Sequence, residues 1–391
     1  MPFYYSIRKD GAKERRQTAE GLLRLRDQLE KEVPRRTVTD TLLLATWNIR
    51  EFDSSKYGYR TSEALHYIAE IISRFDLIAI QEVREDLSAL DEVQRMLGGW
   101  WKYIVTDVTE GSSGNGERMA FMYDGRKVSF GGLAGEIVLP AKKKEPVLQF
   151  ARTPFLCGFR SGWVKFNLCS VHIYYGDSVA DDPRRIEEIR DLAALLAARV
   201  QPPMQPSRPQ GEATSVKNTS GENMILLGDF NIFTRTDETF KALTDPGFRI
   251  PEPLMNLPGS NLGQSKHFDQ IAFLCRPDRF EATKNAGVFN YSTSVFGDAD
   301  EALHAGSMGE DYLRKKDGTE RTDKEKTRYY KDWRTYQMSD HLLLWCELRI
   351  DFSREYLERV RDQEDETRGG AAIVDSGTAD SGSGEGGSEG V

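Results

Sequence analysis

Five short apolar runs in this 391-residue sequence each carry, at one end, polar groups suited to chemistry. A run of this kind is typical of a buried strand, and its polar end marks where the chain leaves the core. Together these ends supply oxygen ligands for a hard divalent cation and two imidazoles for proton transfer. The runs are LLLATWN, LIAIQE, LCSVH, MILLGDFN and SDHLLLW, and their polar members are Asn48, Glu82, His172, Asp229, Asn231, Asp340 and His341.

The order of polar and apolar residues differs between early and late runs. In the first four runs the polar residue follows the apolar stretch, whereas FDQIAFL and SDHLLLW begin with it. If the two late strands run antiparallel to the earlier ones, all the polar ends converge on one edge of the fold. The sequence therefore predicts a single site assembled from distant segments.

Each polar residue in this set also has an ordinary structural explanation. A lone aspartate at a strand end is usually a turn former, and a lone core histidine is usually a hydrogen-bonded structural residue. The joint occurrence of so many such groups favours a site. Asn48 and Glu82 are the best candidates for metal ligands, because Mg²⁺ takes few protein oxygens and keeps several waters.

The other members of the set suggest proton transfer and phosphate binding. Asp269 is placed to orient His341 as a base, and His172 needs a similar carboxylate partner. Glu117, in the loop SGNGERMAF, precedes an apolar strand and is a candidate for the same edge. Asp229 is suited to positioning a nucleophile or a second ion, and Asn231 to holding a phosphate oxygen.

Composition limits the location of the protein. No stretch approaches the roughly 20 apolar residues needed to span a bilayer, and the N-terminus lacks the basic-then-apolar order of a secretory signal. We therefore expect a cytoplasmic protein that has no membrane partner. The four cysteines show no CxxC spacing, which predicts reduced thiols rather than a zinc site.

The net charge of −9 is concentrated at the C-terminal end. Residues 362–391 contain eight acids and one base, so the rest of the chain carries only −2. Because local potential steers binding, the overall charge does not exclude a polyanionic substrate.

The sequence predicts three parts. Residues 1–40 form an N-terminal segment whose amphipathic helix, at 11–33, either docks on the domain or binds a partner. Residues 41–353 form the catalytic domain, and residues 354–391 form an acidic, Gly/Ser-rich disordered tail. Within the domain, two segments read as crossover helices and one, rich in Pro, Ser and Gly, as a mobile loop. The helices are expected at 62–75 and 181–200, and the loop at 201–222.

Seven strings in the order TWNIREFD, LIAIQEVRED, GNGERMAF, SVH, GDFN, FDQIAF and SDHLLLW resemble the endonuclease/exonuclease/phosphatase superfamily, and within it deoxyribonuclease I. The resemblance covers roughly residues 41–350. It implies an α/β fold, a four-layer α/β sandwich of two packed mixed sheets flanked by helices. It also implies hydrolysis of phosphodiesters with a divalent metal, Mg²⁺ or Mn²⁺.

The resemblance implies a role for each candidate residue. Two histidine–carboxylate pairs, His172 with Glu117 and His341 with Asp269, would transfer protons. Asn48 and Glu82 would bind the metal. The metal and phosphate site would be completed by Asp229, Asn231 and Asp340.

Finer matches favour DNA as the substrate. Arg84 stands two residues after the metal-binding glutamate, where the family's DNases have an arginine that reaches the minor groove. Arg50 and Arg152 fall where phosphate-contacting arginines are expected. Asn115, however, replaces a groove-binding tyrosine of the DNases, and their disulfides are absent. RNA, a phosphoinositide or sphingomyelin are alternative substrates, and a non-catalytic binding or effector protein is a further alternative.

Three charged segments leave room for partners. The N-terminal helix and the acidic tail leave room for a regulatory protein partner. Segment 314–334 contains nine bases and five acids, interleaved with Tyr329, Tyr330 and Trp333. Bases with aromatics suit a nucleic-acid backbone and its stacked bases, whereas alternating charges are typical of a solvated helix.

Overall fold

The computed structural model describes residues 2–56, 58–109, 115–140, 148–200, 223–275 and 280–369. The loop predicted at 201–222 and the final residues 370–391 lie outside these ranges. The chain divides into two units, Met1–Asp351 and Phe352–Val391.

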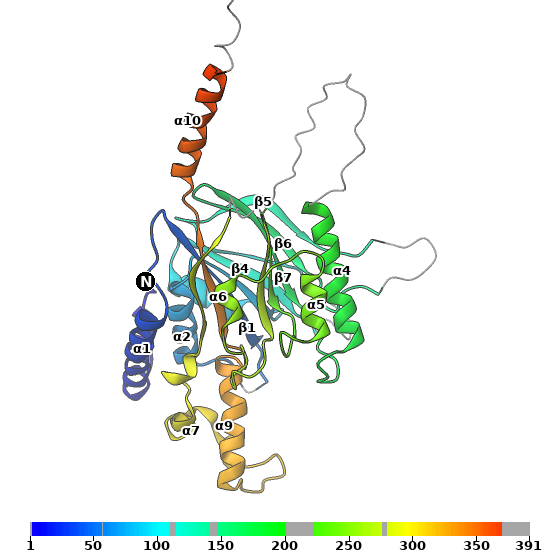
Figure 1. Ribbon diagram of the computed structural model, residues 1–391. Helices are drawn as coiled ribbons and strands as arrows, with labels where there is room; N and C mark the ends of the chain where they lie inside the picture. The colour runs from blue at the N-terminus through cyan, green and yellow to red at the C-terminus, as the bar shows by residue number, and fades with distance from the viewer. Residues whose placement is uncertain are drawn as a thin grey trace, which may run out of the picture. The chain divides into compact units, whose positions relative to one another are not determined.

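The first unit is built on two mixed β-sheets that pack face to face (Figure 1). The six-stranded sheet has the order β10-β11-β1-β2-β4-β3, in which β1 is parallel to β2 and antiparallel to β11. Its strands are β1 (Thr41–Phe52), β2 (Leu77–Val83), β3 (Trp101–Val105), β4 (Arg118–Asp124), β10 (Ala282–Phe289) and β11 (Leu343–Arg349).

The five-stranded sheet has the order β5-β6-β7-β8-β9. Its strand β8 is parallel to β7 and antiparallel to β9. The strands are β5 (Ser129–Glu136), β6 (Phe155–Ser161), β7 (Val164–His172), β8 (Asn223–Asp229) and β9 (Asp269–Leu274).

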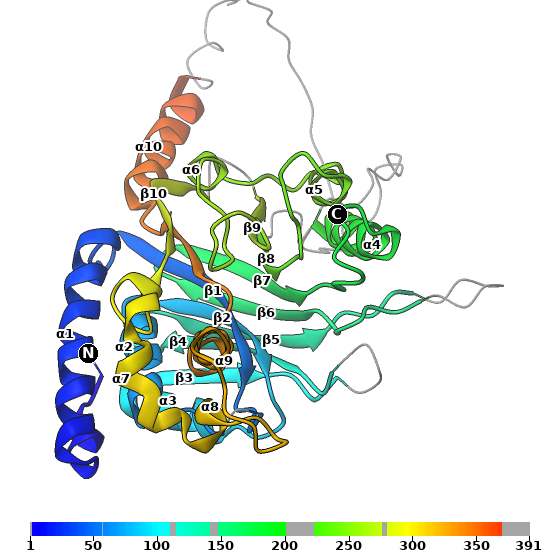
Figure 2. The same ribbon diagram turned by 90° about the horizontal axis from the view of Figure 1, so that it is seen from below.

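Helices cover the outer face of each sheet (Figure 2). On the six-stranded sheet lie α1 (Ala12–Glu32), α2 (Ser62–Ser73) and α3 (Ser88–Leu97), whose buried side chains share one apolar cluster with β1 and β2. On the five-stranded sheet lie α4 (Pro183–Val200) and α5 (Glu238–Thr244). The predicted four-layer α/β sandwich is confirmed, and it explains the continuous apolar runs of the central strands, since both faces of these strands are covered.

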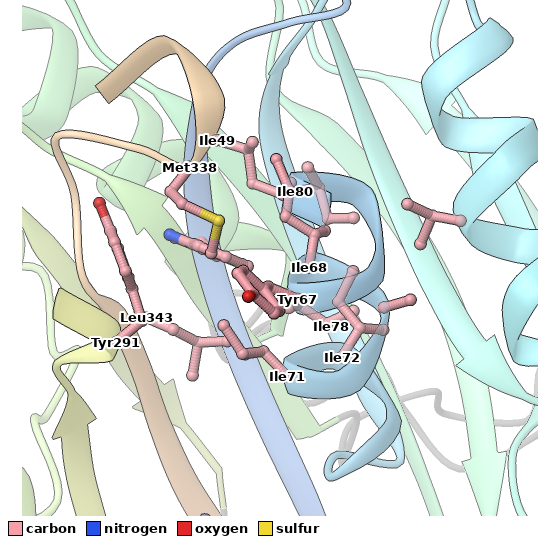
Figure 3. Packing of buried hydrophobic residues seen from close by; sticks show 14 of the residues in the cluster. Ile49, Tyr67, Ile68, Ile71, Ile72, Ile78, Ile80, Tyr291, Met338 and Leu343 are labelled. Atoms are coloured by element: carbon pink, nitrogen blue, oxygen red, sulfur yellow. The ribbon is translucent and has the colours of Figure 1, made fainter. Parts of the chain in front are cut away.

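The residues that pack α2 on the six-stranded sheet are spaced three or four apart on the helix and two apart on the strand (Figure 3). Ile68, Ile71 and Ile72 of α2 pack over Ile78 and Ile80 of β2, and all five are fully buried. Alternate residues of a strand face opposite sides. The intervening positions of β1 and β2 therefore turn toward the second sheet.

A polar contact crosses the space between the sheets. Gln81 of β2 donates to Ser170 Oγ of β7 at 2.9 Å and accepts from Thr46 Oγ1 of β1 at 3.3 Å. All three side chains are fully buried, and their mutual hydrogen bonds satisfy groups that would otherwise be costly to desolvate.

Short helices fill the remaining connections. The segment between β10 and β11 holds η2 (Tyr291–Thr293), η3 (Asp298–Asp300), α7 (Glu301–Met308), α8 (Glu310–Leu313) and α9 (Asp323–Gln337), while η1 (Tyr5–Lys9) precedes α1 and α6 (Glu252–Met255) precedes β9. A capping box between Thr322 and Glu325 starts α9. No helix in the described ranges combines the length and apolar character needed to cross a membrane.

The second unit contains helix α10 (Ser353–Gly369). The prediction that a disordered tail begins at residue 354 is therefore wrong up to residue 369. The segment is very polar, but it is rich in helix-forming Arg, Glu and Gln and contains an i,i+4 pair between Arg354 Nε and Glu358 Oε1 at 3.1 Å. Low apolar content argued against a buried core there, but it did not argue against a helix.

Candidate active site

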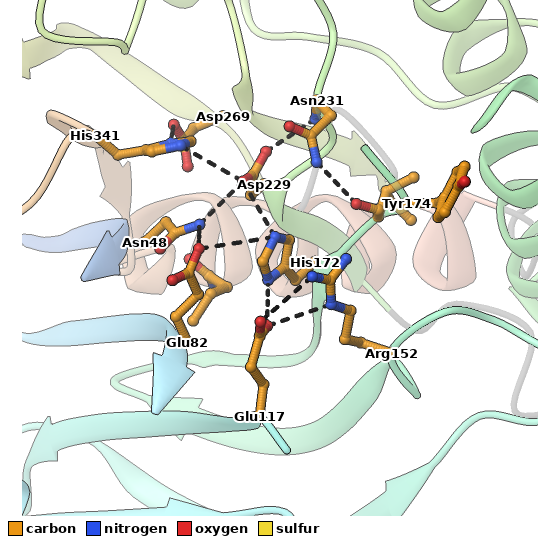
Figure 4. Close-up of polar contacts among 12 residues, drawn as sticks. Asn48, Glu82, Glu117, Arg152, His172, Tyr174, Asp229, Asn231, Asp269 and His341 are labelled. Atoms are coloured by element: carbon orange, nitrogen blue, oxygen red, sulfur yellow. Dashed lines mark hydrogen bonds and ion pairs between the residues drawn. The ribbon is translucent and has the colours of Figure 1, made fainter. Parts of the chain in front are cut away.

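Three strand ends bring polar side chains to one edge of the two sheets (Figure 4). Asn48 ends the regular pairing of β1 with β2, Glu82 lies near the end of β2, and Asp229 ends β8. Asn48 Nδ2 donates to Glu82 Oε1 at 2.9 Å and to Asp229 Oδ2 at 3.0 Å. The antiparallel direction predicted for the two late strands, β9 and β11, is confirmed.

The first histidine–carboxylate pair joins the end of β7 to the residue just before β4. His172 Nδ1 lies 2.7 Å from Glu117 Oε2, and both side chains are buried. Burial opposes the charged imidazolium, yet Glu117 and Asp229 raise the pKa of His172 above its ordinary value. Burial likewise opposes the charged form of Glu117, but His172 and Arg152 lower its pKa to about 2.

The second pair joins β9 to the residues just before β11. His341 Nδ1 lies 2.8 Å from Asp269 Oδ2, and its ring stacks on Phe268 with a centroid distance of 5.3 Å. Burial opposes the charged imidazolium here too, but Asp269 and Asp229 raise the pKa of His341 well above its ordinary value.

Asp229 lies between the two pairs. Its Oδ2 is 3.6 Å from His172 Nε2 and 3.7 Å from His341 Nε2. Its Oδ1 accepts a hydrogen bond from the backbone N–H of Asn231 at 2.9 Å, which fixes the carboxylate. In both rings Nδ1 therefore faces an outer carboxylate, while Nε2 faces the same central one.

Asn231 holds its place through a strained backbone and a buried amide. Its φ is +53°, a left-handed conformation that asparagine tolerates better than most residues. Its Nδ2 donates one hydrogen to the backbone carbonyl of Ile173 at 2.8 Å. The second hydrogen of that amide group remains to serve a ligand.

Asn48 and Glu82 fit a hard cation. Asn48 Oδ1 is buried and has no hydrogen-bond partner, an arrangement that is costly for an amide oxygen unless something binds it. Glu82 Oε2 accepts from the backbone N–H of Glu51 at 2.8 Å, and burial raises the pKa of Glu82 although His172 lowers it. Within the described ranges no three His, Cys, Asp or Glu side chains form a preformed metal cluster, so these two residues would leave several positions to water.

The cleft above these groups has a volume of about 560 Å³. Asn48 and Asp269 lie behind its wall, where they contact Glu82, Asp229 and His341. The other ten predicted site residues line it, namely Arg50, Glu82, Arg84, Glu117, Arg152, His172, Asp229, Asn231, Asp340 and His341.

Two of the predicted arginines make ion pairs with acidic side chains of the site. Arg152 is buried, and its Nε lies 3.3 Å from Glu117 Oε2, so its guanidinium supports the His172 pair as well as lining the cleft. Asp340 stands at the rim with its side chain 43% exposed, and its Oδ2 is 3.6 Å from Arg50 Nε. No described contact joins Asp340 to Asn48.

Sequence reasoning missed four residues of the site, among them Glu51, which lines the cleft. Phe268 and Tyr175 line the cleft, and Phe268 packs flat against His341. Ser339 Oγ accepts from the backbone N–H of His341 at 2.9 Å and donates to the Asn48 carbonyl at 2.6 Å, which ties two strand ends together. Two of them could have been found because they stand next to predicted site residues in the sequence: Phe268 precedes Asp269, and Ser339 precedes Asp340.

Two known proteins are similar in sequence to part of this chain. A protein from Thioalkalivibrio sp. (strain K90mix) named Deoxyribonuclease is 31% identical over 212 residues, which are 52% of this chain and 51% of that protein. Deoxyribonuclease-1 of Rattus norvegicus is 33% identical over 94 residues, 23% of this chain and 32% of that one. The chain thus spans about half the length of the first relative and about a third of the second.

A solved structure of an endonuclease/exonuclease/phosphatase family protein from Bacteroides thetaiotaomicron is 17% identical. The likeness covers 81% of this chain and 98% of that one, with a TM-score of 0.46. The Endonuclease/Exonuclease/phosphatase family itself matches residues 45–287, which include most strands of both sheets. The chain therefore belongs to the endonuclease/exonuclease/phosphatase family.

Proposed function

We propose that the protein is a divalent-metal-dependent phosphodiesterase that cleaves DNA within the strand. The observation that carries the proposal is the convergence of two buried histidine–carboxylate pairs on Asp229, beside Asn48 and Glu82. The family covers nucleases and phosphatases, which hydrolyse phosphoester bonds, and both curated relatives are named deoxyribonucleases.

The two histidines would move protons in opposite directions. Glu117 and Asp269 each hold Nδ1 of their ring, so Nε2 of each ring is the atom that exchanges a proton in the cleft. One Nε2 accepts the proton of the attacking water, and the other donates a proton to the leaving oxygen of the cleaved strand. Asp229 stabilises whichever ring is charged.

The remaining groups would bind the phosphate. Asn48 Oδ1 and Glu82 would hold Mg²⁺ or Mn²⁺, which when bound supplies positive charge next to the phosphate oxygens. The second Nδ2 hydrogen of Asn231 would donate to a phosphate oxygen. Arg50 and Arg84, both on the cleft lining, would attract the flanking phosphates.

Supercoiled plasmid tests the proposal most directly. We expect nicking with Mg²⁺ and none with EDTA. Glu82→Ala should abolish nicking, whereas Glu85→Ala, which removes an exposed carboxylate three positions along the chain, should not. Parallel assays use RNA, a phosphoinositide and sphingomyelin. Faster hydrolysis of any of these, or full nicking in EDTA, contradicts the proposal.

A further inference from the structure

A second groove lies against α8 and α9, in the segment between β10 and β11. Its volume is about 810 Å³, compared with about 560 Å³ for the cleft. Six basic and three acidic side chains line it. We call it the basic groove, and its cations are Lys56, Arg314, Lys316, Arg321, Arg328 and Lys331.

Two of the three acids in the basic groove are already neutralised. Glu325 lies 2.6 Å from Lys315 Nζ, and Asp332 lies 3.3 Å from Arg50 Nη1, and neither of these bases lines the groove. Because partners outside the groove neutralise these acids, the cations that line it present a larger excess of positive charge than their number suggests.

Two of the cations make no ion pair with any side chain that the structure describes. Lys316 and Arg328 are exposed, and among the described residues neither makes an ion pair or hydrogen bond through its side chain. The others are already engaged. Lys331 lies 3.6 Å from Asp298, for example, and Arg321 donates to the backbone carbonyl of Asp311 at 2.9 Å. Lys316 and Arg328 are therefore the groups best placed to take an external anion.

The aromatic residues of this segment turn away from the groove or are covered. Tyr330 and Trp333 are buried, and both pack against the ring of His304. Tyr329 lines the groove, but Arg321 lies over its ring at 4.9 Å from the centroid. Stacking of bases on Tyr330 and Trp333, which the sequence suggested, is not available, and Arg321 already occupies one face of Tyr329, so the groove is better suited to phosphates than to bases.

The basic groove adjoins the candidate active site. Asp332 lines the groove and pairs with Arg50, which lines the cleft. Lys56 lines the groove and lies 3.8 Å from Glu51, which also lines the cleft. Arg50 and Lys56 both lie over the ring of Tyr336, at 4.1 and 5.2 Å from its centroid. A linear polyanion in the cleft would therefore continue into the groove.

We propose that the basic groove binds backbone phosphates of the substrate nucleic acid on one side of the cleaved bond, without reading its bases. The inference rests on the proposed function, because it takes the cleft to hold a phosphodiester. It predicts that affinity depends on substrate length and on salt, since each phosphate contact releases a condensed counterion.

The test compares two double variants of the full chain. Lys316→Ala/Arg328→Ala removes the two unpaired groove cations. Lys13→Ala/Arg15→Ala removes the same charges from the exposed face of α1. Each is measured on a long DNA duplex and on the small ester bis(p-nitrophenyl) phosphate. Duplex binding is also measured by fluorescence anisotropy in EDTA over a range of salt.

We expect the groove variant to raise KM for the duplex about fivefold or more relative to the small ester, and to leave kcat on the duplex near wild type. The slope of log affinity against log salt should fall by up to about 2, because about 0.9 is lost for each phosphate contact. The α1 variant should match wild type. An unchanged slope and an unchanged KM overturn the inference.

The two proposals fail in different ways. Suppose that wild type hydrolyses no phosphodiester, but that its duplex binding depends on salt and the groove variant lowers the slope of that dependence. The proposed function then fails, and the inference about the basic groove stands. If wild type cleaves DNA and both variants behave alike, the groove fails and the function stands. Loss of binding to phosphatidylserine vesicles, with duplex binding retained, overturns the groove in favour of a lipid surface.

Discussion

Asp269 Oδ2 lies 2.8 Å from Nδ1 of His341, and no side chain other than Phe268 stacks on that imidazole among the described ring contacts. The carboxylate fixes which nitrogen faces inward, and the phenyl ring fixes the plane of the imidazole. The orientation of this imidazole is therefore set before any substrate arrives, which is what proton transfer at a defined position requires.

The first prediction concerns the two histidines. His172→Ala and His341→Ala should each lower kcat on DNA by roughly 10²-fold or more, the usual scale for general acid–base catalysis. The double variant should lose far less than the product of the two losses, since both rings act in the same hydrolysis around Asp229 and residues that act as a unit are non-additive. His267→Ala is the control, because His267 is not part of the cleft lining. A single variant with near wild-type kcat at saturating metal would assign that histidine a structural role.

The second prediction concerns metal binding apart from activity. Asn48→Ala removes the buried oxygen that lacks a partner, so Mn²⁺ affinity should fall on the order of 10- to 100-fold. Electron paramagnetic resonance of free Mn²⁺ measures this directly. Asn256→Ala, at an exposed position, should bind Mn²⁺ as wild type does. Equal affinity in all three proteins would remove Asn48 from the metal site.

The third prediction concerns pH and stability. Burial raises the pKa of Glu188 on α4 to about 7, against hydrogen bonds from the backbone of Ala151 and Tyr174 that lower it. The native state therefore holds this proton more tightly than the unfolded state does. The stabilisation is full below the ordinary glutamate pKa and is lost as pH rises toward 7.

Glu188→Gln carries a neutral side chain at every pH. It should match wild type near pH 4 and be more stable by up to about 3 kcal/mol at pH 8, since each pKa unit corresponds to about 1.4 kcal/mol. Urea unfolding at the two pH values measures the difference. A constant difference across pH would show that Glu188 does not titrate in this range.

The fourth prediction concerns the packing of α1 on α2. Ala normally stabilises a helix relative to Gly by about 1 kcal/mol. A Cβ at Gly21, however, would meet the buried hydroxyl of Tyr67 at 1.9 Å, and that hydroxyl donates to Glu63 at 2.7 Å. Gly21→Ala should therefore destabilise the fold, by about 1–3 kcal/mol.

Gly306→Ala on α7 is the matched control for this substitution, because nothing lies within 4 Å of its added Cβ. It should raise the free energy of unfolding slightly. Differential scanning calorimetry distinguishes the two signs, and a stabilising Gly21→Ala would mean that α1 moves away from α2 at little cost.

The sequence predicted much of the fold because buried strands leave continuous apolar runs and their polar ends stand out. Asn48, Glu82 and Asp229 were found in this way, and the structure places them in contact. The sequence does not show which residues lie opposite one another on neighbouring strands. That His172 lies opposite Asp229, and Asp229 opposite Asp269, depends on the registers of three paired strands.

Other features depend on neighbours that no local pattern reveals. Arg152 lies outside every strand, and only its contact with Glu117 shows that it supports a histidine pair. Tyr330 and Trp333 stand among charges in the sequence, yet α9 turns both rings inward. The polar composition of α10 suggested disorder. Composition indicates how much of a segment can be buried, but it does not exclude an exposed helix.

The sheet order has a consequence for synthesis. Strand β11 follows every other strand in the chain, yet it lies between β10 and β1 rather than at an edge, and it begins two residues after His341. A nascent chain therefore lacks one of the two imidazoles until residue 341 has emerged, and a central strand of one sheet until residue 349 has emerged. One late segment thus completes both the six-stranded sheet and the pair of imidazoles, which couples the formation of the candidate site to the closing of that sheet.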